Sequence, residues 1–171
     1  MTIVRNETNI VLARTILMLN TLEALSELTF LLDKTDNIYS RLIHTMGENP
    51  DKVRIFYMLY FRGELTQKEI IEINGMPKQS VSNIILKMQS SNQIKLISNP
   101  SDKRSKLIEL TQEGREYAAV LLRPIIESEQ KVLQKMGKDG VEEYVRYTRL
   151  YASFLEEELK IQEKKNEDTV I

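Results

Sequence analysis

A predicted helix over residues 78–91 carries apolar groups on one side and hydrogen-bonding groups on the other. At about 100° per residue, one face collects the apolar residues at i, i+3, i+4 and i+7: Val81, Ile84, Ile85 and Met88. The opposite side centres on Gln79 and Asn83, with Ser80, Ser82, Leu86 and Lys87 beside them and Lys78 at the start. Amides can bind adenine in the DNA major groove, hydroxyls can read several bases, and lysines can contact phosphates. The simpler alternative is an ordinary solvent-exposed helix face, where these residue types are common.

A second group of candidate residues lies at the tip of a predicted hairpin. Lys103, Arg104 and Lys106 stand beside Asp102 between two short strands. An arginine at a hairpin tip suits a narrow minor groove, where the electrostatic potential is most negative. We expect Asp102 to hold the Arg104 guanidinium in a bidentate ion pair. A polar hairpin with an incidental ion pair is the alternative.

Helix and strand signals around these residues predict a winged helix-turn-helix from about Thr66 to Thr111. Thr66 and Glu69 form a capping box that opens a helix ending at Asn74-Gly75, and Pro77 starts the next helix. A turn of three or four residues between two short helices is the helix-turn-helix spacing. Residues 94–98 and 106–110 then read as two strands joined by turn residues, which is the wing.

Helices are predicted on both sides of this element, so the fold class is mainly α with a small β-hairpin wing. Residues 8–46 lack Gly and Pro, with a break expected near residues 20–21 or 33–36. Asn49-Pro50 begins a short helix that ends at Arg62-Gly63. Thr111 caps a helix to about residue 135, interrupted or bent near Pro124, and a last helix covers residues 141–165 after a turn at 137–140.

Composition excludes several kinds of site. The chain of 171 residues has no cysteine and one histidine, so disulfides, thiolate zinc, iron–sulfur and multi-histidine sites are excluded. No nucleophile–histidine–acid set and no glycine-rich phosphate loop is present, which predicts that the protein is not an enzyme and has no cofactor. No apolar run is long enough to span a bilayer, and the N-terminus lacks a signal-peptide pattern. We therefore expect a cytoplasmic protein without a membrane partner.

Charge is distributed unevenly along the chain. The formal net charge is −1, but residues 62–106 carry eight basic and four acidic side chains, a net of +4. The flanking segments are net acidic. A basic middle between acidic flanks is expected when only the centre faces phosphate.

Four runs carry a family resemblance: residues 65–70, 77–85, 102–106 and 110–114. Together they resemble the MarR family of bacterial transcriptional regulators, and the resemblance covers roughly residues 29–155. It implies a homodimer, with dimerisation helices at residues 1–48 and 112–171 and a winged helix-turn-helix DNA-binding domain at 49–111. It also implies that α-helical residues 78–83 enter the major groove of double-stranded DNA and that Arg104 enters the minor groove. The full set of candidate DNA contacts is Thr66, Lys78, Gln79, Ser80, Ser82, Asn83, Lys87, Asp102, Lys103, Arg104 and Lys106.

The resemblance further implies a sequence-specific repressor, released by a small lipophilic or phenolic effector. Four residues are placed to approach a cleft between the helical part and the winged lobe: Tyr39, His44, Arg54 and Tyr57. Each is more simply interpreted as a core or interface residue, and His44 as a partly buried structural one. A helical protein–protein interaction module that does not bind DNA is the alternative function.

The chain departs from the family pattern at three places. Asn92 stands where glycine is usual, and asparagine tolerates the left-handed conformation. Leu96 replaces a frequent basic residue, so one phosphate contact is expected to be missing. About 20 residues at the N-terminus exceed the common length, and we expect them to add a helix at the dimer interface.

Overall fold

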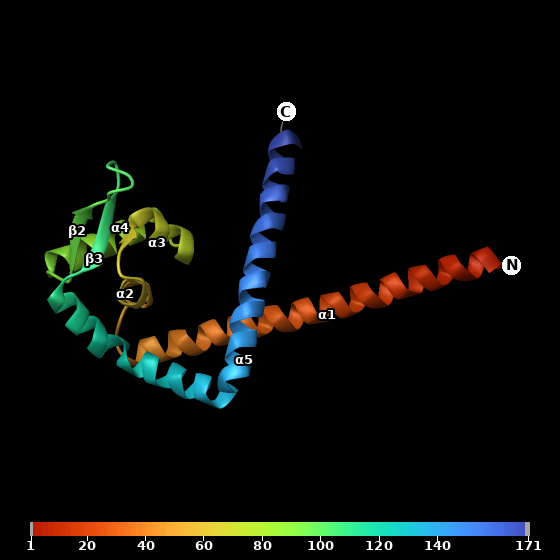
Figure 1. Cartoon of the computed structure of the whole chain (residues 1–171), viewed down its shortest axis with the longest axis horizontal. Helices are drawn as coiled ribbons and strands as arrows, with labels where there is room; N and C mark the ends of the chain where they lie inside the picture. Colours follow the sequence, from red (N-terminus) through yellow and green to blue (C-terminus); the bar gives the residue numbers. More distant parts are fainter. Residues whose placement is uncertain (1, 170–171) are drawn as a thin grey trace. The chain divides into compact units, whose positions relative to one another are not determined.

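Helices form most of the chain, and three short strands form one small sheet (Figure 1). The computed structural model describes the backbone of residues 2–169 and the side chains of residues 20–163. The elements in order are α1 (Thr2–Thr45), α2 (Pro50–Arg62), β1 (Leu65–Thr66), α3 (Gln67–Asn74), α4 (Lys78–Ser90), β2 (Ile94–Ser98), β3 (Lys106–Leu110) and α5 (Gln112–Thr169). The chain divides into two compact units, residues 1–120 and 121–171.

Local capping explains where the short helices of the first unit begin and end. The Asn49 side chain accepts a hydrogen bond from the Lys52 N–H at 2.9 Å, and Pro50 takes the first position of α2. At α3 the capping box is present, and Gly75 closes the helix in the left-handed conformation. These starts and stops confirm the helix-turn-helix that the sequence predicted.

The sheet has the strand order β1-β3-β2, and both pairings are antiparallel. β2 and β3 occupy the predicted residues, with Leu96 opposite Ile108. β1 was not predicted, because two residues carry no alternating pattern. Its pairing of Leu65 with Ile108 ties the start of α3 to the wing.

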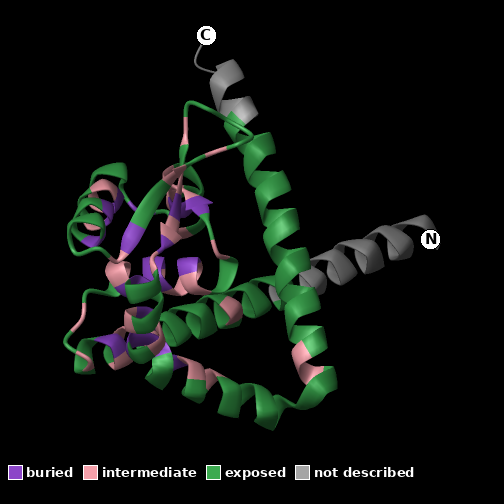
Figure 2. Ribbon diagram, turned by 60° about the vertical axis from the view of Figure 1, so that its left-hand side comes forward, coloured by how far each residue is buried: buried purple, intermediate pink, exposed green. Residues whose placement is uncertain are grey.

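One hydrophobic core supports the helix-turn-helix and the wing. Figure 2 shows the buried residues gathered between the helices and the sheet of this lobe. Fully buried side chains come from every layer, and they include Phe56, Ile70, Val81, Met88 and Ile108. Apolar packing therefore holds one face of α4 against the core, and its opposite face is exposed to solvent.

The long helices differ from the sequence prediction in their breaks. α1 is continuous, and the hydroxyls of Thr29 and Thr35 donate to carbonyl oxygens one turn earlier, at 2.9 and 2.8 Å. α5 is not interrupted at Pro124; its non-helical residue is Gly137, with φ 71° and ψ 168°. The break thus falls at the glycine of the predicted turn, which adopts a positive φ without steric cost.

Both units expose apolar side chains along helices. On α1 they include Leu22, Leu25, Phe30, Leu31, Leu32 and Ile38. In the second unit, residues 121–171, they include Tyr144, Tyr147, Leu150, Tyr151, Phe154 and Leu155. Many exposed large apolar side chains on one helix are the kind of surface that proteins use for interaction. The side chains of residues 1–19, which include most of the expected additional N-terminal helix, lie outside the described part of the chain.

Candidate nucleic-acid interface

α4 turns its amide and charged side chains to solvent. Val81, Ile85 and Met88 are buried and Ile84 is half-buried. Lys78, Gln79, Asn83 and Lys87 are exposed, and Ser80 and Ser82 are half-buried. On the outward side, the Gln79 amide nitrogen donates to Asn83 Oδ1 at 3.2 Å. The two amides therefore form a paired hydrogen-bonding surface one helical turn long.

Ser82 belongs to the contact between α3 and α4. Its hydroxyl accepts from Gln67 Nε2 at 2.7 Å and donates to the Lys78 carbonyl oxygen at 2.9 Å. The hydrogen bond with Gln67 joins the two helices of the motif, and the one with Lys78 lies within α4, so both engage Ser82 inside the domain. Gln67 was not among the sequence candidates, since nothing in the local pattern indicates which residue on α3 faces α4.

Thr66 is occupied by helix capping. Its hydroxyl lies 3.2 Å from the Glu69 nitrogen, from which it accepts, and 2.7 Å from Glu69 Oε2, to which it donates. The Thr66 N–H also donates to Glu69 Oε2 at 2.7 Å. The hydrogen bonds from the Thr66 backbone and side chain lower the pKa of Glu69 below its ordinary value of 4.5.

The wing tip is organised by its own polar groups, and one expectation about it is wrong. Asp102 Oδ1 accepts from the backbone N–H of Arg104 at 3.0 Å, and no ion pair joins Asp102 to the Arg104 guanidinium within the described side chains. Asparagine and aspartate side chains often close turns in this way. At the base of the tip, Asn99 Nδ2 donates a hydrogen bond to Ser105 Oγ at 2.8 Å. Asp102 therefore shapes the turn and leaves the guanidinium exposed.

Basic side chains of the winged element are mostly free. Lys68 pairs with Glu72 at 3.6 Å and Lys95 with Glu109 at 3.1 Å. Among the described side chains, no ion pair is formed by the other basic residues of the segment: Arg62, Lys78, Lys87, Lys103, Arg104 and Lys106. Cations without acidic partners keep their electrostatic attraction for phosphate.

The loop between α4 and β2 packs against the first turn of α5, a contact that the sequence analysis did not foresee. Asn92 has φ 54°, as expected of an asparagine in a glycine position. Its amide donates to Glu113 Oε2 at 2.9 Å, and Thr111 Oγ1 donates to the Asn92 carbonyl at 2.6 Å. Thr111 also accepts from the Gly114 N–H at 2.9 Å, which caps α5. Gly114, in the first turn of α5, is the sequence signal that could have indicated this close approach.

A polar cluster joins α2 to α5 within the first unit. Lys52 Nζ lies 3.1 Å from Glu48 Oε2 and donates to the Tyr117 hydroxyl at 2.9 Å. Tyr117 in turn donates to Glu48 Oε1 at 2.9 Å. Burial alone would raise the pKa of Glu48, but the hydrogen bonds from Lys52 and Tyr117 lower it overall. Burial likewise opposes the charge of Lys52, yet its hydrogen bonds with Tyr117 and Glu48 raise the Lys52 pKa.

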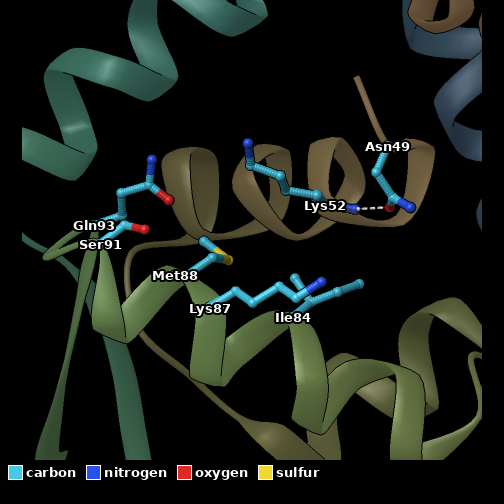
Figure 3. A pocket seen from close by; sticks show the side chains of 7 residues that line it. All are labelled: Asn49, Lys52, Ile84, Lys87, Met88, Ser91 and Gln93. Atoms are coloured by element: carbon cyan, nitrogen blue, oxygen red, sulfur yellow. Dashed lines mark hydrogen bonds between the residues drawn. The ribbon is translucent and has the colours of Figure 1, made fainter. Parts of the chain in front are cut away.

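A cavity of about 250 Å³ opens beside this cluster, between α2 and α4 (Figure 3). Its lining combines apolar, amide and ammonium groups, from Asn49, Lys52, Ile84, Lys87, Met88, Ser91 and Gln93. None of the four predicted pocket residues lines this cavity. Arg54 instead pairs with Asp36 of α1 at 2.6 Å, and the Tyr57 ring packs at a tilt of 48° against Phe61, with 4.7 Å between ring centroids. Tyr39 is half-buried, and His44 is exposed in this chain rather than partly buried.

Helices α2–α4 are followed by a β-hairpin, α4 has an outward polar face, and the hairpin tip is basic. This arrangement defines the winged helix-turn-helix class of DNA-binding proteins. Residues 42–105 match the model of the MarR family. A MarR family regulator from Neisseria meningitidis is 26% identical, covers 80% of this chain and 96% of its own, and superposes with a TM-score of 0.68. Residues 42–105 therefore resemble the MarR family, and the chain has the winged-helix fold of solved MarR-family transcription regulators.

Two further solved structures share the fold. MepR from S. aureus in its DNA-binding conformation is 19% identical, with a TM-score of 0.60 and coverage of 75% of this chain and 97% of its own. The PcaV regulator from Streptomyces coelicolor, in complex with its natural ligand, is 19% identical, with a TM-score of 0.53 and coverage of 72% and 89%. No curated protein matches the chain. The matching family model and the solved structures with this fold are those of transcription regulators.

The described residues lack two kinds of feature. No group of three or more histidine, cysteine, aspartate or glutamate side chains there could hold a metal ion. No described helix is long and apolar enough to cross a membrane.

Proposed function

We propose that the protein is a repressor that binds an operator as a homodimer, with α4 in the major groove and the wing tip in the minor groove. The observation that carries this proposal is the shared exposure of the α4 amides and the unpaired cations of residues 62–106. Lys78 and Lys87 stand near the two ends of α4 for phosphates, and Gln79 and Asn83 lie between them for base edges. Lys103, Arg104 and Lys106 extend the cationic surface along the wing.

The exposed apolar side chains of the long helices support the proposed homodimer. The apolar side chains of α1 and of residues 141–155 have no cover in the single chain, and a second copy would bury them. A two-fold dimer would bind a pseudo-palindrome with half-sites about 34 Å apart. We therefore propose two kinds of domain. Residues 1–48 and 112–171 form the dimer, and residues 49–111 bind DNA.

A small effector is a second part of the proposal. The cavity is lined by residues of both α2 and α4, so a molecule that binds more tightly to one position of α4 than to another would shift α4. PcaV was solved with its natural ligand, which supports regulation by small molecules within this fold. The residues Tyr39, His44, Arg54 and Tyr57 stay candidates for a separate effector cleft between the helical part and the winged lobe.

The experiment is a mobility-shift titration of the full chain on DNA from upstream of its own gene, repeated over a range of salt concentrations. We expect tight binding whose affinity falls by about one log unit per log salt for each phosphate contacted. Arg104→Ala should weaken binding at least tenfold and leave the dimer intact. Lys138→Ala removes an exposed cation of the second unit, one that pairs with Glu142 at 3.8 Å, and serves as the matched control. A chain that binds neither this DNA nor a random duplex at low salt would instead be a protein–protein interaction module.

A further inference from the structure

Leu86 interrupts the polar surface of α4. Its side chain is 62% exposed, although it lies in a helix whose other large apolar residues, Val81, Ile84, Ile85 and Met88, are buried or half-buried. Around the helix axis, Leu86 stands about 100° to 160° from the three fully buried residues. It is therefore on the outward face, about 20° from Gln79 and about 60° from Asn83.

One neighbour of Leu86 on this face is Asn83, a proposed base-reading residue. Asn83 lies three residues earlier, about 4.5 Å along the helix axis. A base pair advances the DNA axis by about 3.4 Å. A side chain at position 86 would thus reach one or two base pairs beyond the base that Asn83 contacts.

The chemistry of the major groove offers one partner for such a side chain. Base edges there present hydrogen-bond donors and acceptors, which leucine cannot satisfy, and a single apolar group, the 5-methyl of thymine. Placing leucine over any other edge would remove polar atoms from water without replacing their hydrogen bonds. Leucine over the thymine methyl would instead bury two apolar surfaces against each other.

We propose that Leu86 contacts a thymine methyl in each half-site and makes α4 select thymine over cytosine at that position. This inference rests on the proposed DNA binding and adds a specificity-determining residue to it. Removing one methyl from the contact should weaken binding about fourfold per half-site, the equivalent of one buried methylene group.

The test uses the full-length protein and an operator duplex selected from random sequence. Each thymine pair related by the operator symmetry is replaced in turn by deoxyuridine, which removes only the methyl. We expect one position where the wild type loses about fourfold in affinity per half-site and where Leu86→Ala shows no further loss. At that position 5-methylcytosine should be bound more tightly than cytosine by the wild type and equally by Leu86→Ala.

Two outcomes would overturn the inference in different ways. If the selected operator is bound but every deoxyuridine affects the wild type and Leu86→Ala equally, Leu86 reads no methyl and the proposed function stands. If selection yields no bound duplex, the proposed function fails and the inference fails with it. Because Leu86 is exposed, its replacement by alanine should leave the melting temperature unchanged, which excludes misfolding as the cause of a loss.

Discussion

The backbone carbonyl of Gln93 occupies the space in which a side chain at Gly114 would begin. A Cβ built on Gly114 would lie 1.8 Å from the Gln93 oxygen and 2.6 Å from its carbonyl carbon. The same oxygen accepts a hydrogen bond from the Thr111 N–H at 3.1 Å, so it cannot swing away freely. Glycine at 114 therefore lets the first turn of α5 close against the loop that supports the wing.

Replacing Gly114 with alanine should destabilise the fold strongly. The obstructing atoms are backbone rather than a flexible side chain, and we expect the free energy of unfolding to fall by about 3 kcal/mol or more. Gly140→Ala is the matched control, since its added Cβ would meet only Met136 Cβ at 3.7 Å. That change should be neutral or stabilise a helix by up to about 1 kcal/mol. Denaturant unfolding of both variants decides the matter, and equal midpoints would contradict the steric argument.

Asn92 should tolerate glycine better than alanine. Its φ of 54° strains a residue with a Cβ, and alanine would also lose the hydrogen bond to Glu113. We expect Asn92→Ala to cost about 1–2 kcal/mol, whereas in Asn92→Gly the relief of strain offsets the lost hydrogen bond. Thermal unfolding of the two variants gives the ranking. Alanine as stable as glycine would show that the turn relaxes to another conformation.

Asp102→Asn separates turn formation from ion pairing at the wing. Asparagine can accept the Arg104 N–H as aspartate does, but it carries no charge to oppose phosphate. Operator affinity at low salt should therefore rise about twofold to fivefold, the range of a surface charge interaction of ~0.5–1 kcal/mol. Asp102→Ala, which removes the acceptor, should lower affinity. Equal losses in the two variants would mean that the carboxylate charge holds Arg104 after all.

Glu69 should contribute to the pH dependence of stability. Its folded-state pKa is lowered below 4.5 by the hydrogen bonds from Thr66, so its contribution is present above that pH and disappears as the pH falls through the lowered value. The variant Glu69→Gln keeps an acceptor but cannot titrate. The stability difference between wild type and variant should shrink as the pH is lowered from 5 to about 3. A difference that is constant over this range would rule out titration of Glu69.

Local signals account for the parts of the fold that the sequence predicted. Asn49, Thr66 and Thr111 cap helices through residues one turn away, and the apolar and polar residues of β3 alternate over five positions. Such patterns lie within one element, so they can be recognised without the rest of the chain. The helix-turn-helix, the wing and the outward face of α4 were predictable for this reason.

Contacts between distant segments account for what was missed. β1 becomes a strand only because Leu65 meets Ile108, and the need for Gly114 arises from Gln93. The role of Asp102 was predicted wrongly, because a carboxylate near an arginine can accept either from the arginine backbone N–H or from the guanidinium. The sequence is the same in both cases. Three-dimensional proximity, rather than residue type, decides each of these cases.

The hydrogen bonds of the wing tip all stay within residues 98–106. Asn99, Ser101, Asp102, Arg104 and Ser105 bond to one another, and the tip adds no residue to the buried core. Its sequence can therefore drift with little cost to the domain beneath. Natural variation concentrated there would retune affinity for DNA in small steps, which makes the tip a site where related regulators can diverge in their targets while keeping one scaffold.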